Sequence, residues 1–262
     1  MKQNFGRNMY GLAAIAYGII TLLWHQIDSL GNFTHPAILI YFAGAAELIG
    51  GLAIQWDKTA KLGSVVLFSF YFIFTLYLVP PILKNPLVYF TWGNFFEEYS
   101  IAIGSVFVFA STLQNKPETA SKIYSAAYKC FGICVISYSL YQLFYLSYTA
   151  GLVPKWIPPG QMFWAVATTI AFAVAAYAIL SGRLALLASR LLTIMFLGFS
   201  LLVWFPLCFS NPHGLIGWDS NAETLAVAGS VWIVADFIFQ QNIIPVSRAF
   251  SKMPVKLSES AD

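Results

Sequence analysis

The sequence has little charge, little histidine and little cysteine. Only 10% of its 262 residues are charged, against about 25% in an ordinary soluble domain. The three cysteines are too few for a disulfide framework, and the three histidines have no metal-ligand spacing. No phosphate-binding loop or nucleophile elbow occurs. These absences argue against a soluble enzyme, and we expect no metal centre and no nucleic-acid partner.

The chain is rich in apolar residues instead. Hydrophobic residues make up 59% of it, and the mean hydropathy is +0.71. A helix needs about 20 residues to cross the hydrocarbon core of a bilayer. Runs of that kind lie near 9–26, 37–55, 62–82, 96–113, 126–148, 161–181, 184–208 and 222–240. The sequence therefore predicts an all-α membrane protein with eight transmembrane helices.

The basic residues predict the orientation of these helices. Twelve of the 14 lysines and arginines lie at the amino terminus, in alternate connections between the spans, or in the tail. Only Lys84 and Lys155 fall in the other connections. The positive-inside tendency then places both termini in the cytoplasm, as an even number of spans requires. We expect a multi-pass protein of the cell membrane, with the bacterial cytoplasmic membrane as its location.

Two halves of the chain share a pattern of residues. Proline, asparagine, proline and tryptophan recur 126 positions apart, and glutamate, glycine, serine and valine recur 125 apart. The first set is Pro80, Asn85, Pro86, Trp92 with Pro206, Asn211, Pro212, Trp218, and the second is Glu98, Gly104, Ser105, Val106 with Glu223, Gly229, Ser230, Val231. The pattern predicts two parallel four-helix repeats over 1–115 and 124–241, a polar linker over 116–123 and a cytoplasmic tail over 242–262.

The connections 83–95 and 209–221 are predicted loops on the non-cytoplasmic side. Each follows a proline near the end of a span, contains an Asn-Pro turn and ends in a tryptophan. Two interpretations fit these loops. Trp92 and Trp218 can anchor the bundle at the membrane interface, or they can form the rim of an outward-facing pocket and contact the substrate.

Glu47 lies midway along the second predicted helix, where an ionised carboxylate is costly in lipid. Gly44 and Gly51 flank it and predict a close approach of another helix. One hypothesis makes Glu47 a proton-accepting catalytic group, and the other makes it an interhelical hydrogen-bond partner of a third-helix residue such as Tyr71 or Ser69. Aligning the repeats places Phe172 opposite Glu47, so the acid is expected in one repeat only.

Glu98 and Glu223 are the acids that both repeats share. Each follows the rim tryptophan by a few residues, and we expect each at the start of the last helix of its repeat, where a carboxylate stabilises the free N–H groups. The alternative is that both bind substrate. His25, at the end of the first predicted span, is a candidate proton relay to Glu47.

Several segments of the second repeat resemble the DoxX-like family of small bacterial membrane proteins. They are Leu152-Val-Pro-Lys-Trp-Ile-Pro158, Phe163-Trp164, the 182–188 stretch Gly-Arg-Leu-Ala-Leu-Leu-Ala and Phe205-Pro206. The resemblance covers 126–241, and residues 47–51 resemble the glycine-rich second helix common in that family. It implies a four-helix module and an association with thiosulfate:quinone oxidoreductases or other membrane redox complexes.

Two functional classes follow from these observations. In the first, the protein is the membrane subunit of a quinone-linked oxidoreductase: aromatic helices bind the quinone, Glu47 supplies the proton, and a soluble redox partner supplies electrons. In the second, it is a carrier or binding module for a small or lipidic molecule, with its site between the repeats. A structural scaffold in the lipid bilayer is the third alternative.

Overall fold

The computed structural model describes residues 5–26, 37–113 and 115–251, without the side chains of 37 and 240–251. Its elements are α1 (Phe5–Trp24), α2 (Ala37–Ala53), α3 (Ala60–Tyr77), α4 (Val79–Lys84), α5 (Tyr89–Thr112), α6 (Pro117–Phe144), α7 (Leu146–Leu152), α8 (Gln161–Ser181), α9 (Ala185–Phe199), the π-helical turn η2 (Ser200–Trp204), α10 (Phe205–Ser210) and α11 (Leu215–Ser251). All regular structure in these ranges is helical, which confirms the predicted all-α class.

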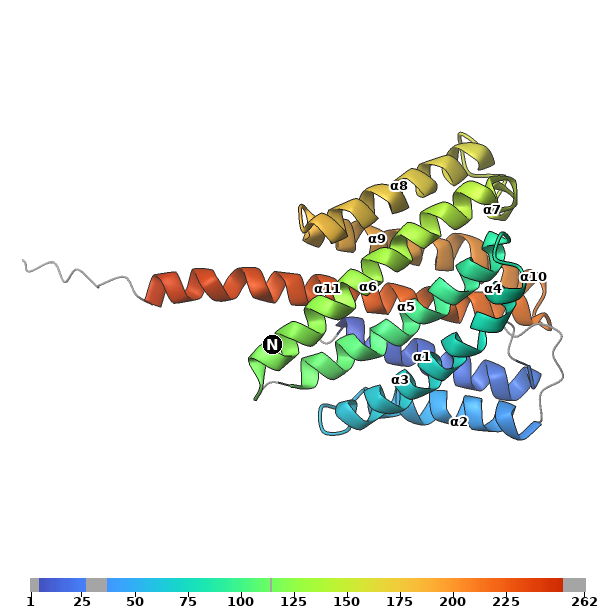
Figure 1. Cartoon of the computed structure of the whole chain (residues 1–262). Coiled ribbons are helices and arrows are strands. Elements are labelled where there is room, and N and C mark those ends of the chain that lie inside the picture. The colour runs from blue at the N-terminus through green and yellow to red at the C-terminus, as the bar shows by residue number, and fades with distance from the viewer. Residues whose placement is uncertain (1–4, 27–36, 114, 252–262) are drawn as a thin grey trace, which may run out of the picture.

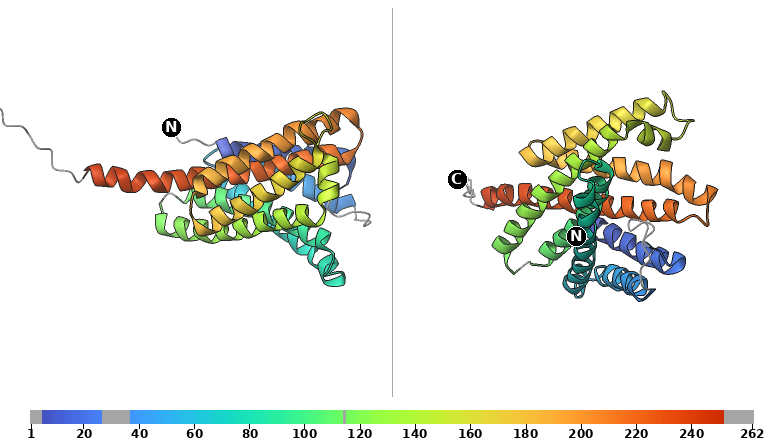
Figure 2. Two further views of the ribbon diagram at one scale, coloured as in Figure 1. Left: turned by 90° about the horizontal axis from the view of Figure 1, so that it is seen from above. Right: turned by 45° about the vertical axis from the view of Figure 1, so that its right-hand side comes forward.

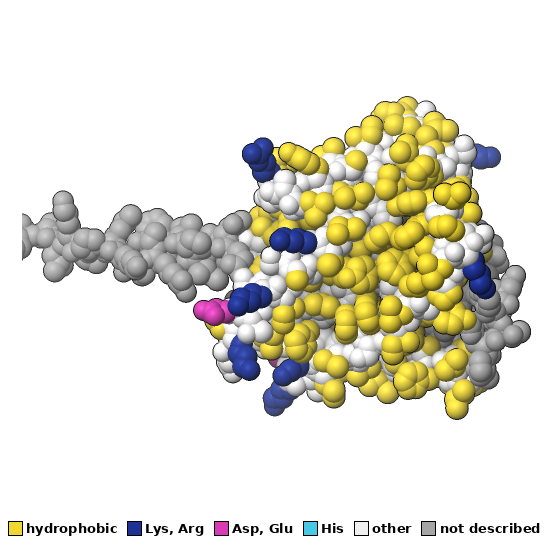
Figure 3. Space-filling model, viewed as in Figure 1, with side chains coloured by type: hydrophobic (Ala, Val, Ile, Leu, Met, Phe, Trp, Pro, Cys, Tyr) yellow, Lys and Arg dark blue, Asp and Glu magenta, His cyan; other side chains and the backbone are white. Residues whose placement is uncertain are grey.

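Five helical segments are long and apolar enough to cross a membrane. They are Ala60–Lys84, Pro117–Phe144, Gln161–Ser181, Ala185–Ser210 and Leu215–Phe239. The predicted spans near 9–26, 37–55 and 96–113 correspond to α1, α2 and α5, which fall outside this group, and α2 is apolar but has only 17 residues. Hydrophobic side chains cover the middle of the visible face, and basic side chains gather mainly near the end where α11 leaves the bundle (Figure 3). These features are those of a membrane protein.

The helices pack in two matching series. In the first, α1 contacts α2, α2 contacts α3 and α3 contacts α5; in the second, α6 contacts α8, α8 contacts α9 and α9 contacts α11. The series meet where α1 packs on α11, α5 on α6 and α5 on α11. Figure 1 shows α5 and α11 running between the other members of the two series. Each of the three contacts named for one series therefore has a counterpart in the other, whereas the contacts of α7 with α6 and α8 belong to the second series alone.

Small residues let these helices approach one another closely. A Cβ atom added at Gly18 would lie 2.7 Å from the Gly44 carbonyl oxygen, and one added at Gly51 would lie 2.7 Å from the Gly11 carbonyl oxygen. Both distances are shorter than van der Waals contact, so the α1 and α2 backbones touch where the side chains are absent. The close approach predicted beside Glu47 is confirmed.

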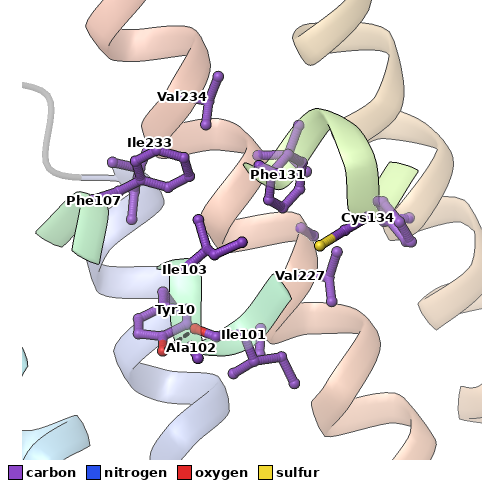
Figure 4. Packing of buried hydrophobic residues seen from close by; sticks show 14 of the residues in the cluster. Tyr10, Ile101, Ala102, Ile103, Phe107, Phe131, Cys134, Val227, Ile233 and Val234 are labelled. Atoms are coloured by element: carbon purple, nitrogen blue, oxygen red, sulfur yellow. Dashed lines mark hydrogen bonds between the residues drawn. The ribbon is translucent and has the colours of Figure 1, made fainter. Parts of the chain in front are cut away.

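The centre of the apolar core lies between α1, α5, α6 and α11 (Figure 4), and the core extends to residues of α3, α8 and α9. Tyr10 is fully buried there and satisfies its hydroxyl group by hydrogen bonds to the Ile101 carbonyl oxygen at 2.8 Å and to Ser105 Oγ at 2.9 Å. A Cβ atom on Gly229 would lie 2.6 Å from the Tyr10 backbone nitrogen. The glycine and the serine shared by the two halves thus belong to the helix crossing at the centre of the molecule.

The two predicted rim loops are shorter than expected. α4 continues to Lys84 and α5 begins at Tyr89, while α10 continues to Ser210 and α11 begins at Leu215. Each following helix begins three residues after the proline of the Asn-Pro turn, so Trp92 lies in the first turn of α5 and Trp218 in the first turn of α11. Their indole N–H groups donate hydrogen bonds back to the carbonyl oxygens of Pro86 at 3.0 Å and Pro212 at 3.1 Å.

The predicted linker and tail also differ from expectation. α6 begins at Pro117, because proline suits the first turn of a helix, where its missing N–H has no partner to lose. Residues 117–123 are therefore polar but helical. α11 continues past the bundle to Ser251, as both views of Figure 2 show. The rest of the predicted tail, 252–262, lies outside the described residues.

Candidate functional site

A cavity of about 860 Å³, which we call the main cavity, opens between the second helical series and α5. Residues of α4, α5, α6, α7, α8, α9, η2 and α11 line it. Much of its wall is aromatic: Tyr138, Trp164, Phe172, Phe196, Phe199 and Trp204. Ligand sites for drug-sized molecules enclose about 300–1,000 Å³ and are mostly apolar. The main cavity has the volume and the walls of such a site.

Four carboxyl groups interrupt these apolar walls: Glu97, Glu98, Asp219 and Glu223. Glu98 and Asp219 are buried, with 5% and 8% of their surfaces exposed. Among the described residues that line the main cavity, none is a lysine, an arginine or a histidine. Carboxylates gathered in a low-dielectric enclosure attract positive charge strongly. The cavity is therefore suited to a ligand that combines an apolar body with a cationic group.

Three of these acids, Glu97, Glu98 and Glu223, lie about two turns inside α5 and α11 and not at the helix ends. Glu97 and Glu223 are each the ninth residue of their helix, and Glu98 is the tenth. The expectation that Glu98 and Glu223 cap these helices is wrong, because the helices begin further upstream than predicted. Both side chains line the main cavity instead.

A second enclosure, the small cavity, lies in the first helical series and has a volume of about 10 Å³. Its eight lining residues are Tyr17, Thr21, Glu47, Phe70, Tyr71, Phe74, Glu98 and Asp219. The Thr21 hydroxyl donates a hydrogen bond to Glu47 Oε2 at 3.2 Å. Tyr71 of α3 is also buried and lies within hydrogen-bonding reach of the Glu47 carboxyl group, as one of the two hypotheses for Glu47 expects. Glu98 and Asp219 line both cavities.

The two cavities are lined from corresponding positions. Six residues of the small cavity have a residue 125 positions away that lines the main cavity. The pairs are Glu47/Phe172, Phe70/Met195, Tyr71/Phe196, Phe74/Phe199, Glu98/Glu223 and Asp219/Asn94. The other two, Tyr17 and Thr21 of α1, match Tyr138 and Gln142 of α6 at a spacing of 121. One set of positions therefore forms a water-sized space in one series and a ligand-sized space in the other.

The structure brings only some of the predicted site residues together. Glu47 and Tyr71 line the small cavity, Glu223 the main cavity and Glu98 both. Trp92, Trp218 and His25 line neither.

His25 follows the end of α1 in a left-handed conformation with a φ of 53°. Its side chain is exposed, and its Nε2 lies 3.1 Å from the Tyr41 hydroxyl. The His25 ring packs against Tyr41 of α2, with the ring centroids 5.6 Å apart, and the structure shows no contact between His25 and Glu47. Trp218 contacts the ring of Trp24, with the centroids 6.5 Å apart.

Sequence reasoning missed Asp219 and Trp164. Asp219 fell inside a predicted loop, although it precedes Glu223 by four residues, as Asn94 precedes Glu98. Residues four apart share one helix face, so this repeated spacing was a usable signal. Trp164 repeats the contact of the rim tryptophans, because its indole N–H donates to the carbonyl oxygen six residues earlier, on Pro158, at 2.9 Å.

The chain matches no protein-family model, no curated protein and no solved structure. The resemblance to the DoxX-like family therefore stays a prediction, and the functional argument depends on the two cavities.

Proposed function

We propose that this protein is a membrane-embedded binding module or carrier for a small amphipathic molecule with a cationic group. The main cavity carries the proposal, because it joins aromatic walls to four carboxyl groups with no basic side chain among its described lining residues.

The chemistry of the walls supports this ligand class. A cation over an aromatic face gains about 0.5–2 kcal/mol, more as it is desolvated, and Trp164 and Tyr138 offer such faces. The carboxyl groups of Glu98, Asp219 and Glu223 supply negative charge in the same cavity. A ligand with an apolar body and one positive charge matches both features. It fills the aromatic part of the cavity and pairs with Glu98, Asp219 or Glu223.

We also propose that the chain crosses the bacterial cytoplasmic membrane eight times, as two parallel four-helix repeats with both termini in the cytoplasm. α1, α2 and α5 complete the set with the five long apolar segments. The matching helix contacts and the correspondence between the cavity linings support a duplication. The gathering of basic residues at one end supports the orientation.

A second candidate is the membrane subunit of a quinone-linked oxidoreductase, the role that the DoxX-like resemblance implies. The observation in its favour is that aromatic rings and carboxyl groups line the same cavity. The rings would stack on the quinone, and Glu98 or Glu223 would donate a proton during its reduction. A soluble partner would supply the electrons.

Equilibrium binding of labelled tetraphenylphosphonium, an apolar cation, to the purified protein in nanodiscs tests the first proposal. We expect saturable binding that falls about tenfold or more in Glu223→Gln, because the cation loses a desolvated partner. Glu118→Gln is the matched control, since Glu118 is an exposed acid in the first turn of α6, and it should bind as the wild type does. Displacement of the cation by a neutral short-chain quinone, with equal binding to Glu223→Gln, would favour the oxidoreductase and contradict the carrier.

A further inference from the structure

The third helix of each series runs into a proline, and the two halves of the chain accommodate this proline differently. Proline lacks the N–H that continues the hydrogen bonds of an α-helix, so the regular ladder is interrupted there. In the first half, the Thr75 carbonyl oxygen accepts from the N–H of Leu78, three residues on. In the second half, the carbonyl oxygen of Ser200, 125 positions later, accepts from the N–H of Phe205, five residues on. The first half therefore makes a tight turn before its proline, and the second makes a wide turn.

The wide turn contains a one-residue insertion. Phe74 precedes Pro80 by six positions, whereas Phe199 precedes Pro206 by seven. A π-helical turn closes its hydrogen bonds over five residues and not four, so η2 takes up the extra residue. This insertion explains why the spacing between the repeats changes from 125 to 126. Single π-helical turns inside longer helices occur frequently at functional sites.

The wide turn also forms part of the wall of the main cavity. Three of the five residues of η2 line this cavity, namely Leu202, Val203 and Trp204. In the first half, Phe74 lines the small cavity, but none of residues 75–84 does. A Cβ atom added at Gly198, one turn before the wide turn, would meet nothing within 4 Å. The insertion therefore coincides with the place where the second half gains lining residues and open space.

A hydrogen bond holds the wide turn against α11. Ser200 Oγ donates to Asn221 Oδ1 at 2.6 Å. At the corresponding position of the first half, the Thr75 hydroxyl donates to the Tyr71 carbonyl oxygen of its own helix at 2.7 Å. The same hydroxyl position thus serves its own helix beside the tight turn and joins two helices beside the wide one.

We propose that η2 determines the size of the ligand that the main cavity accepts. The extra residue places the side chains of Leu202, Val203 and Trp204 in the cavity wall, where they contact the apolar body of the ligand. The acids of α5 and α11 contact its positive charge. Selection by size and selection by charge therefore belong to different helices. The ligand in this inference rests on the proposed function, whereas the effect of the extra residue on the cavity wall does not.

Deletion of Leu201 tests this role, because it restores the six-residue spacing of the first half. Leu201 lies in η2, but its side chain is 62% exposed and does not line the main cavity. Equilibrium binding in nanodiscs compares a large cation, tetraphenylphosphonium, with a small one, benzyltrimethylammonium. The deletion should lower the affinity for the large cation about tenfold or more and change that for the small cation less than about twofold. Leu201→Ala keeps the chain length and is the matched control, which should bind both cations as the wild type does.

A second variant tests the same role without changing the length of the chain. Ser200→Ala removes only the hydroxyl group that joins η2 to α11. It should lower the affinity for tetraphenylphosphonium about threefold, the effect of one lost hydrogen bond, and leave that for benzyltrimethylammonium unchanged. Thr75→Val removes the corresponding hydroxyl of the first half and should change neither affinity. Equal losses for the two cations in the deletion variant and in Ser200→Ala, or no loss for either cation, would overturn the assignment of size selection to η2.

A ligand-free experiment separates this inference from the proposed function. If neither cation binds to the wild type, the proposed function fails, and the crystal structure of the unliganded deletion variant then tests the wide turn alone. Without the extra residue, Leu202, Val203 and Trp204 should leave the wall of the main cavity. If all three still line a cavity of unchanged volume, the insertion does not shape the wall and the inference is wrong.

Discussion

The two cavities differ in size by almost two orders of magnitude, although corresponding residues line them. In the first series, Glu47 and Tyr71 stand where the second has Phe172 and Phe196. Polar groups therefore surround a water-sized space beside the first series, whereas mostly apolar rings surround a ligand-sized space beside the second. The comparison teaches that one arrangement of helices can border either a small polar space or a large aromatic one.

The largest expected effect comes from truncating one pair of matched phenylalanines. Phe74 is 8% exposed beside the small cavity, whereas Phe199 is only partly buried beside the main cavity. Phe74→Ala should lower stability by about 3–5 kcal/mol, because it opens a void in a packed region. Phe199→Ala should cost less, since its ring already borders open space. Thermal unfolding in detergent measures both, and equal losses would mean that the two environments are packed alike.

The acids that line both cavities provide the next test. Replacing Glu98 with Gln and Asp219 with Asn removes two buried charges from the site of the proposed cation. Roughly a hundredfold loss of tetraphenylphosphonium affinity should follow. The single change Glu47→Gln should reduce affinity far less, because Glu47 does not line the main cavity. Equilibrium binding gives both values, and a larger loss in Glu47→Gln would reverse the assigned roles.

A pair of glycines compares the packing of the two series directly. A Cβ atom at Gly18 would lie 2.7 Å from the Gly44 carbonyl oxygen, whereas one at Gly198 would meet nothing within 4 Å. Gly18→Ala should destabilise the protein by about 1–3 kcal/mol through overpacking. Gly198→Ala should stabilise it by about 0.5–1 kcal/mol, since alanine favours the helix. Chemical unfolding curves test the opposite signs, and a shared sign would contradict the difference in packing.

The smallest effect concerns the tryptophans. Trp92→Phe and Trp164→Phe each remove one hydrogen bond to a proline carbonyl oxygen, so each should lower stability by about 0.5–1.5 kcal/mol. Only Trp164 lines the main cavity, so only Trp164→Phe should also weaken cation binding. A weaker affinity in Trp92→Phe would show that the tether itself shapes the cavity.

Much of the fold could be predicted from the sequence, because apolar runs and repeated turn residues are local signals. The all-helical class, the position of most helices and the close packing around Glu47 follow from such patterns. The starts of α5 and α11 could not be found in the same way. Asn-Pro suggests a loop, and nothing local reveals how quickly the chain returns to a helix. Because the helix starts were predicted too far downstream, Asp219 was assigned to a loop, and Glu98 and Glu223 were assigned to helix caps.

The site was less predictable than the fold, since a cavity is defined by side chains from distant segments. Glu47, Tyr71, Glu98 and Glu223 were found because acids in apolar helices stand out, as does a tyrosine placed near one. Trp164 has no such signal, because a tryptophan near the end of a helix is typical of any membrane protein. The position of His25 at the end of α1 was predicted, but the contacts of its ring were not, because the direction of a side chain after a helix end depends on the backbone conformation there.

The contact between an indole N–H and a proline carbonyl oxygen six residues earlier occurs at Trp92, Trp164 and Trp218. Each indole N–H group is hydrogen-bonded within its own chain, so it does not require water or a lipid headgroup as an acceptor. These three corners can therefore keep their shape in bilayers of different composition. Trp164 is the member of this set that lines the main cavity, so this part of the cavity wall is held by a contact within the chain and not by the surrounding lipid.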